Sequence, residues 1–190
     1  ARIAFLRQAA PEEAADLPDL SEAALARRAE DWLPMAAGDP PLRSLGAVSP
    51  QALHDAIGAL VPWESRRRFD ALVPETFAVP GGRPVPIDFR DGVAGFAARA
   101  QALFGMDGHP AILRGRVPLA VTLLSPAGRP IQTTTDLPGF WRGGWAEVRR
   151  EMRGRYPRHD WPQDPATAAP RRRGEIRPQS QRRSGRPQLG

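Results

Sequence analysis

Residues 117–135 read VPLAVTLLSPAGRPIQTTT. Residues 117–124 are mostly β-branched or aliphatic, which is typical of a buried strand. Residues 125–128 have the composition of a turn, and β-branched residues return over residues 130–135. This pattern predicts a β-hairpin.

A second hairpin is predicted upstream. Two short runs that are typical of strands, residues 76–79 and 85–89, flank the turn-forming residues 80–83. Between the hairpins, apolar residues recur at helical spacing over residues 93–104, and Gly105 follows as a helix C-terminal signal. The middle of the chain is therefore predicted to run strand, strand, helix, strand, strand.

Helices are predicted on both sides of this β region. Ser21, Ser49 and Asp136 are residue types that cap helix N-termini, and Pro50 suits a first helical position. Pro34 is expected to end or kink the helix that contains it. The predicted N-terminal helices span residues 19–37, 50–60 and 63–72.

A basic segment follows the second hairpin. Residues 141–156 carry apolar side chains at helical spacing, with arginines along one flank. Gly143 and Gly144 each cost about 1 kcal/mol relative to alanine inside a helix, so one long helix and two short helices both fit the sequence. Aromatic residues at this spacing are most often core residues, which is the interpretation that we prefer for Trp141 and Trp145.

These elements predict an α+β fold with N-terminal helices, two β-hairpins around a helix that form a small sheet, and a C-terminal basic helix. We expect a helical lead-in segment over residues 1–60, an α+β domain over residues 61–165 and a flexible, basic tail over residues 166–190. Because the first residue is Ala1 rather than Met, we also expect the chain to be part of a longer protein.

Composition excludes several classes of protein. The absence of cysteine excludes disulfides and thiolate metal sites, and with three histidines no metal is expected. All 27 basic residues are arginine, which excludes a lysine-containing phosphate-binding loop and a lysine Schiff base. No nucleophile or metalloprotease motif occurs, so we assign no catalytic residue and expect no enzyme in this stretch. No apolar run approaches the ~20 residues of a membrane span, so a cytoplasmic protein without a membrane segment is expected.

The basic charge is concentrated at the C-terminus. Residues 142–190 hold 13 arginines and five acidic residues, a net charge of +8, whereas residues 1–141 have a net charge of −2. Such an asymmetry indicates a polyanionic partner, of which nucleic acid is the commonest. Charge that only keeps the protein soluble is the alternative.

Five runs of residues resemble, in order and spacing, the C-terminal domain of HrpB-type bacterial helicases. They are VPGGRPVPIDF (79–89), GRVPL (115–119), LLSPAGRPIQ (123–132), DLPGFW (136–141) and EVRREMRGRYPRHDWPQDP (147–165). The resemblance extends from about Trp63 to Pro165. Departures are few: Arg150 and Arg158 stand where the family often has lysine, and the glycine pair at 143–144 stands where longer side chains are common.

The resemblance implies that the parent protein is a DEAH-box-like, ATP-dependent RNA helicase. Two RecA-like motor domains of the same polypeptide would precede Ala1 and would hold ATP and Mg²⁺, so no cofactor is expected in this chain. The chain itself would be an accessory domain that binds single-stranded RNA, or DNA, through arginine–phosphate contacts. Tyr156 and Trp161, which follow the basic helix, are candidates for stacking on bases. The predicted nucleic-acid site consists of Arg142, Arg149, Arg150, Arg153, Arg155, Arg158, Tyr156 and Trp161.

Two alternatives remain open at the level of sequence. The arginine flank and the helices around Trp63 fit a module that docks on the motor or on another protein without contacting nucleic acid. The segment after Pro170 also fits nonspecific binding by the tail alone, in which case the predicted site would have no part in affinity.

Overall fold

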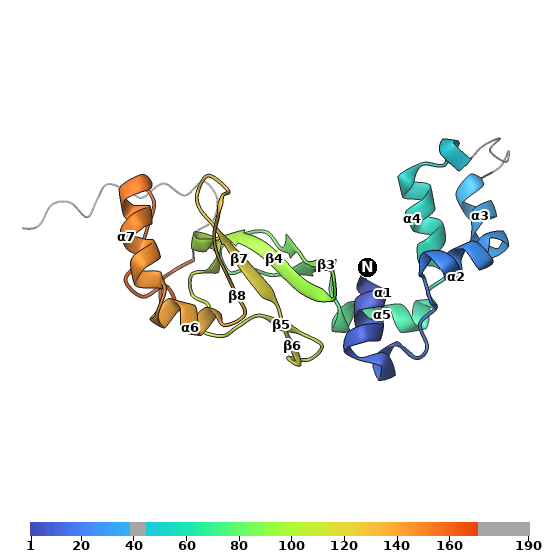
Figure 1. Ribbon diagram of the computed structural model, residues 1–190, viewed down its shortest axis with the longest axis horizontal. Helices are drawn as coiled ribbons and strands as arrows, with labels where there is room; N and C mark the ends of the chain where they lie inside the picture. The colour runs from blue at the N-terminus through green and yellow to red at the C-terminus, as the bar shows by residue number, and fades with distance from the viewer. Residues whose placement is uncertain (39–44, 171–190) are drawn as a thin grey trace, which may run out of the picture.

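The computed structural model describes residues 1–38 and 45–170 (Figure 1). Its helices are α1 (Arg2–Ala9), α2 (Glu22–Arg27), α3 (Ala29–Ala37), α4 (Pro50–Ala59), α5 (Trp63–Leu72), α6 (Leu137–Arg142) and α7 (Trp145–Arg155), with short 3-10 helices η1 (Pro11–Ala14), η2 (Leu45–Ala47) and η3 (Ala100–Leu103). Its strands are β1 (Thr76–Phe77), β2 (Val85–Pro86), β3 (Asp88–Arg90), β4 (Val93–Arg99), β5 (Ala111–Ile112), β6 (Val117–Pro118), β7 (Ala120–Leu124) and β8 (Pro130–Thr134). The α+β class expected from the sequence is confirmed.

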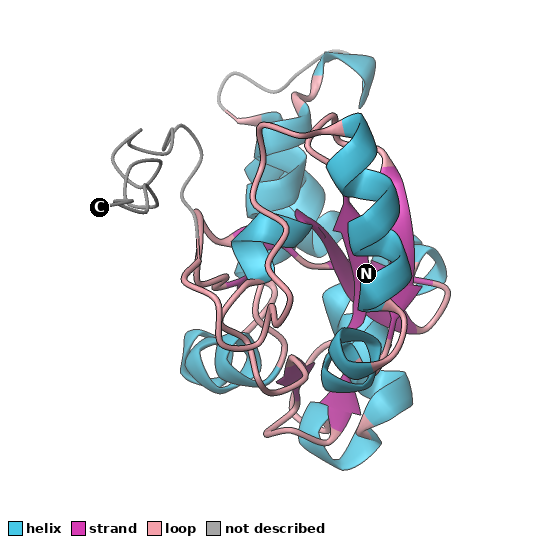
Figure 2. Ribbon diagram, turned by 90° about the vertical axis from the view of Figure 1, so that its left-hand side faces the viewer, coloured by secondary structure: helices cyan, strands magenta, loops and turns pink. Residues whose placement is uncertain are grey.

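The molecule is elongated (Figure 1). Helices α2, α3 and α4 lie at one end, the strands lie in the middle, and α6 and α7 lie at the other end. Figure 2 views the molecule along this long axis, from the end that carries α6 and α7. None of the described helices combines the length and the apolarity that a membrane span requires.

The N-terminal helices begin at the predicted caps. The side chains of Ser21 and Ser49 accept hydrogen bonds from the backbone N–H groups three residues later, at 3.3 and 3.1 Å. The helix predicted over residues 19–37 is instead two helices, because the backbone at Arg28 (φ −110°, ψ 22°) leaves the helical conformation. Pro34 lies inside α3, so the break precedes the proline.

A four-stranded sheet with the order β3-β4-β7-β8 forms the middle of the molecule. Strand β4 pairs antiparallel with β3 and parallel with β7, and β7 pairs antiparallel with β8. Two smaller antiparallel pairs, β1 with β2 and β5 with β6, lie outside this sheet. Both predicted hairpins are confirmed, since β1 pairs with β2 and β7 with β8.

The helix predicted over residues 93–104 is wrong, because this segment forms β4 and then η3. Side chains along β4 alternate between the core and the outer face of the sheet, which is the period of a strand. Those in the core are Ala94, Phe96 and Ala98. Asp91 and Gly92 have φ values of 52° and 74°, which make a two-residue hairpin turn between β3 and β4. The apolar pattern fits both periods, and this turn selects the strand.

One hydrophobic core joins the N-terminal residues to the sheet and to the C-terminal helices. It includes Phe5 of α1 and extends to Trp161, beyond α7. Three alanines that are buried within α2–α4 lie outside this core: Ala24, Ala36 and Ala56. The predicted lead-in over residues 1–60 therefore has two parts, of which α1 and η1 pack in the main core.

The predicted tail begins inside the described region. Ala166 and Ala168 pack partly against the core, and the buried Pro165 accepts a hydrogen bond from the Gly105 N–H at 2.9 Å. The remainder of the predicted tail, residues 171–190, lies outside the described residues.

Candidate nucleic-acid interface

The basic segment forms two helices rather than one. An oxygen of Asp136 accepts a hydrogen bond from the Gly139 N–H at 2.9 Å and caps α6, as predicted. Helix α6 ends before Gly143 and Gly144, and α7 begins at Trp145. The turn brings Gly144 against the ring of Phe140, whose atoms would lie 3.0 Å from any Cβ at that position. Of the two alternatives that the sequence left open, the broken helix is correct.

Three tryptophans hold α6 and α7 on the core. The indole N–H groups donate to backbone carbonyl groups: Trp141 to Met106 at 3.0 Å, Trp145 to Pro162 at 2.9 Å and Trp161 to Tyr156 at 3.0 Å. The ring of Trp145 packs edge-to-face on Phe104, with 5.7 Å between centroids. The interpretation of Trp141 and Trp145 as core residues is therefore confirmed.

Trp161 also belongs to this aromatic cluster. Its side chain is only 6% exposed, and its ring centroid lies 5.9 Å from that of Trp145. The expectation that Trp161 presents a stacking surface is wrong, because the segment after α7 folds back and buries it. Tyr156, directly after α7, is half-buried and meets His159 edge-to-face at 6.2 Å.

Three of the six predicted arginines have partners within the domain. The Arg149 Nε donates to the Trp161 carbonyl at 2.8 Å, so this side chain anchors the segment that follows α7. Arg155 pairs with Glu151 at 3.1 Å, and Arg150 lies 3.9 Å from Glu147. The ion pairs of Arg150 and Arg155 are exposed, and such pairs are weak enough to exchange for another anion.

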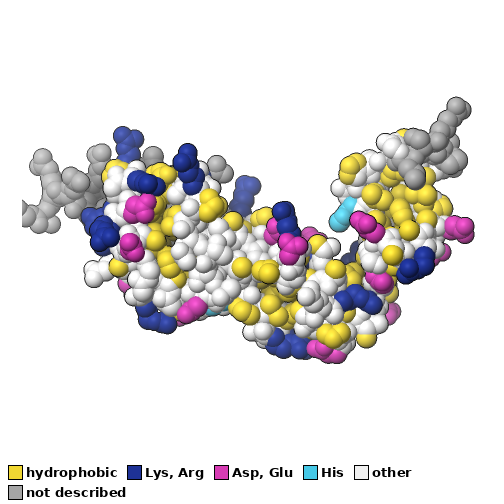
Figure 3. All heavy atoms as spheres, in the orientation of Figure 1, with side chains coloured by type: hydrophobic (Ala, Val, Ile, Leu, Met, Phe, Trp, Pro, Cys, Tyr) yellow, Lys and Arg dark blue, Asp and Glu magenta, His cyan; other side chains and the backbone are white. Residues whose placement is uncertain are grey.

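The other three arginines are exposed and make no ion pair with any residue in the described part of the chain. They are Arg142 at the end of α6, Arg153 in α7 and Arg158 in the loop after it. Arg153 and Arg155 occupy the last turn of α7, where the helix dipole favours cations. Figure 3 shows dark blue side chains gathered over the end of the molecule that holds α7. Guanidinium groups held there suit forked contacts with phosphate oxygens.

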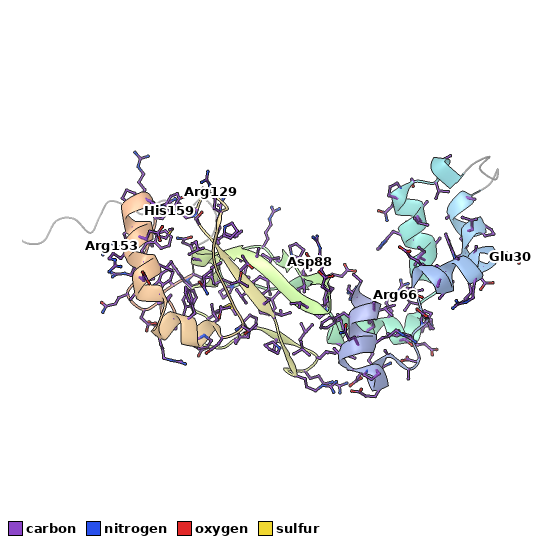
Figure 4. All side chains as sticks on the ribbon, viewed as in Figure 1. Glu30, Arg66, Asp88, Arg129, Arg153 and His159 are labelled. Carbon is purple, nitrogen blue, oxygen red and sulfur yellow. The ribbon has the colours of Figure 1, made fainter. Side chains whose placement is uncertain are left out.

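One further arginine at this end of the molecule, Arg129, was not predicted from the sequence. Arg129 closes the turn between β7 and β8, where its N–H donates to the Ser125 hydroxyl at 3.1 Å and its carbonyl accepts from the Ser125 N–H at 2.8 Å. Its side chain is exposed, and Figure 4 shows it at the hairpin tip, at the end of the molecule that also carries Arg153 and His159. The sequence did contain a signal for Arg129, because this residue directly follows the predicted turn at residues 125–128.

A profile of a known family matches residues 32–165, and its description is ATP-dependent helicase C-terminal. The chain belongs to this helicase C-terminal family. The resemblance that the motifs indicated is thereby confirmed. The matched residues contain every arginine of the candidate interface, whereas α1 and η1 lie before them.

Similarity to relatives of known sequence and known structure also supports membership of this family. The ATP-dependent RNA helicase HrpB of Escherichia coli K12 is 41% identical over 160 residues, which are 83% of this chain and 19% of the relative. A crystal structure of the E. coli DExH-box NTPase HrpB superposes with a TM-score of 0.80 and 39% identity, over 90% of this chain and 21% of that one. A crystal structure of the E. coli DEAH/RHA helicase HrpB gives a TM-score of 0.64 and 34% identity, over 84% and 20%. The chain spans about a fifth of the length of these relatives.

The described residues contain no group of three or more histidine, cysteine, aspartate or glutamate side chains that is arranged to hold a metal ion. The side chains at the α7 end offer chemistry of another kind. It consists of guanidinium donors for anions and one half-buried tyrosine ring.

Proposed function

We propose that this chain is the accessory C-terminal domain of an ATP-dependent RNA helicase and that its α7 end binds single-stranded RNA. The observation that carries the proposal is a set of exposed arginines without ion pairs in the described region, on a member of the helicase C-terminal family. The set consists of Arg129, Arg142, Arg153 and Arg158. ATP and Mg²⁺ would act in motor domains elsewhere in the same polypeptide.

The proposed contacts are to the phosphates of the strand. An arginine presents parallel N–H donors that match two phosphate oxygens, whereas sequence readout needs groups aimed at base edges. Arg150 and Arg155 join the contact when a phosphate replaces their carboxylate partners. With Trp161 buried, stacking is limited to the accessible part of the Tyr156 ring, so little base preference is expected.

The test is fluorescence anisotropy with a short single-stranded RNA over a series of salt concentrations. Four to six phosphate contacts predict a slope of log affinity against log salt of roughly −3 to −4, from about −0.7 per contact. Reversing the charge at Arg129, Arg153 and Arg158 to glutamate is expected to weaken binding and make the slope shallower by roughly 2. A single-stranded DNA of the same sequence measures the preference for RNA.

A matched control distinguishes binding at a defined site from attraction by the net charge of the protein. Glutamates at Arg27, Arg83 and Arg90, which are exposed arginines on α2, in the β1–β2 loop and on β3, change the net charge by the same amount. We expect this control to retain most of the affinity. An equal loss of RNA affinity in both triple variants would show that only the overall electrostatic field of the protein determines binding.

A truncation distinguishes RNA binding by the α7 end from RNA binding by the tail. Residues 171–190 follow the last core residues, so residues 1–170 retain the whole described core. The proposal requires that this shorter chain still binds the RNA and still responds to the charge reversal. Complete loss of affinity on truncation would assign binding to the tail instead.

A further inference from the structure

Trp63 is the most exposed large hydrophobic side chain of the described residues, with 74% of its surface accessible. The three tryptophans of the C-terminal half, Trp141, Trp145 and Trp161, are by contrast buried in the core. Trp63 lies in the first turn of α5, a helix that is fixed to the core by Phe69 and Leu72. An indole on a rigid helix loses little conformational freedom on binding, which is why tryptophan is enriched among the residues that dominate protein interfaces.

Trp63 shares the exposed face of α5 with residues that line a cavity. Arg66, Arg67 and Asp70 follow Trp63 at helical spacings of three, four and seven residues, which places all four on one side of the helix. Arg66 and Asp70 line a cavity of about 440 Å³ between α4 and α5. Figure 3 shows the molecule hollowed between the α2–α4 end and the middle. Figure 4 shows Arg66 at this junction.

Charges of both signs line this face. Arg67 is exposed and forms no ion pair within the described region, while the exposed Glu64 lies one residue from Trp63. Acidic side chains of α4, of α5 and of the segment before β1 line the cavity: Asp55, Asp70 and Glu75. Arg2 also lines the cavity and forms ion pairs with Asp70 and Glu75, each at 2.7 Å. Because acidic and basic side chains are interspersed here, the face offers a phosphate backbone no concentration of positive charge, whereas a protein surface can present complementary charges of both signs. The pattern therefore favours a protein partner over an RNA.

We propose that the α5 face, defined by Trp63, Arg66, Arg67 and Asp70, docks on the motor portion of the parent helicase. This inference rests on the proposed function, in which the remaining four-fifths of a polypeptide of HrpB length holds the motor. The partner surface carries an apolar pocket for the indole and a carboxylate opposite Arg67. The α5 face would then hold the accessory domain in place and leave the α7 end for RNA.

Hydroxyl-radical footprinting tests the proposal, because oxidation of Trp63 reports directly on whether its ring is covered. It is measured by mass spectrometry in the 190-residue chain and in the parent polypeptide, both without RNA. Oxidation of Trp63 is expected to be several-fold slower in the parent. Met35, which is 52% exposed on α3, serves as an internal reference on a different surface.

A charge reversal tests the contact without risk to the core. Arg67→Glu in the parent is expected to bring Trp63 oxidation back toward the rate in the 190-residue chain. Arg27→Glu on α2 is the matched control and should leave Trp63 protected. Equal oxidation of Trp63 in the wild-type parent and in the 190-residue chain would refute the docking.

RNA and ATPase measurements distinguish the other outcomes. Protection of Trp63 that appears only after single-stranded RNA is added would make this face a nucleic-acid site and overturn the docking proposal. RNA-stimulated ATPase activity of the parent is measured separately. A parent with this activity and an unprotected Trp63 overturns the docking alone, whereas a parent without the activity overturns the proposed function.

Discussion

Arginines of one helix have different roles in this domain. Arg149 and Arg153 are four residues apart and lie on the same side of α7. The Nε of Arg149 donates to the Trp161 carbonyl at 2.8 Å, whereas Arg153 is exposed without an ion pair in the described region. Arg149 therefore stabilises the fold in addition to any contact with RNA, and a binding variant at this position would also perturb the structure.

Stability measurements separate the two roles. Arg149→Ala is expected to lower the free energy of unfolding by about 1.5–3 kcal/mol, because a charged donor is lost and the Trp161 carbonyl is left without its partner. Arg153→Ala is expected to change it by less than about 0.5 kcal/mol, as for other exposed side chains. Urea denaturation followed by tryptophan fluorescence measures both. An equally small change in the free energy of unfolding in both variants would show that the hydrogen bond of Arg149 contributes nothing to stability.

At the scale of elements, the sheet depends on the close approach of two parallel strands. Gly95 of β4 faces Ala120 of β7, and a Cβ at position 95 would lie 2.5 Å from the Ala120 carbonyl oxygen and 2.9 Å from its Cβ. The glycine thus permits the pairing that joins the β3–β4 hairpin and the β7–β8 hairpin into one sheet. Gly154 of α7 has no atom within 4 Å of its own hypothetical Cβ.

Alanine at these two glycines is expected to act in opposite directions. Gly95→Ala should destabilise the protein by about 1–3 kcal/mol, because the strands must move apart. Gly154→Ala should stabilise it by up to about 1 kcal/mol, because alanine favours the helix. Thermal unfolding by circular dichroism gives both values. A stable Gly95→Ala variant would mean that β4 and β7 separate without cost.

Across the whole molecule, acidic residues near the N-terminus bind arginines from distant segments. Glu13 of η1, whose side chain is 15% exposed, pairs with Arg68 of α5 at 3.1 Å. It also pairs with Arg114 at 3.4 Å and Arg116 at 3.2 Å, in the loop between β5 and β6. Arg2 of α1 adds a separate link, because its guanidinium donates to the Val73 carbonyl at 2.8 Å. These contacts reinforce the packing of α1 and η1 in the main core.

Two other carboxylates near the N-terminus, those of Glu12 and Asp16, predict that the protein loses stability in acid. Hydrogen bonds from the Ser65 hydroxyl and the Arg68 guanidinium lower the pKa of Asp16. A backbone hydrogen bond, and then Arg116, lower the pKa of Glu12. The unfolded chain therefore takes up protons at higher pH than the folded chain does. The stabilisation is complete above the ordinary carboxylate pKa of about 4 and is lost as the pH falls through the lowered pKa values.

Urea titrations at a series of pH values below 7 check this expectation. The free energy of unfolding should fall below about pH 4, and it should fall less steeply in Asp16→Asn, which lacks one of the titrating groups. Identical slopes in the wild type and the variant would contradict the role of Asp16.

Several features of the fold and of the site were predictable from local sequence. Capping residues such as Ser49 and Asp136 marked helix starts, and the residues around the turn at 125–128 marked a hairpin, because caps and turns depend on nearby atoms. The segment 93–104 was misassigned, because its apolar pattern fits a helix and a strand alike. One of its two neighbours, β7, lies more than twenty residues later in the chain, whereas the Asp91–Gly92 turn toward the other, β3, is a local signal for a strand.

Local sequence is enough to establish the family, the α+β class and the C-terminal excess of arginine, since these depend on residue identity and order. Only the tertiary structure decides which aromatic and cationic groups remain accessible. Trp161 is buried and Arg149 is engaged because the segment after α7 folds back onto the helix. Accessibility is set by contacts between residues that are distant in the chain, and neither composition nor spacing contains that information.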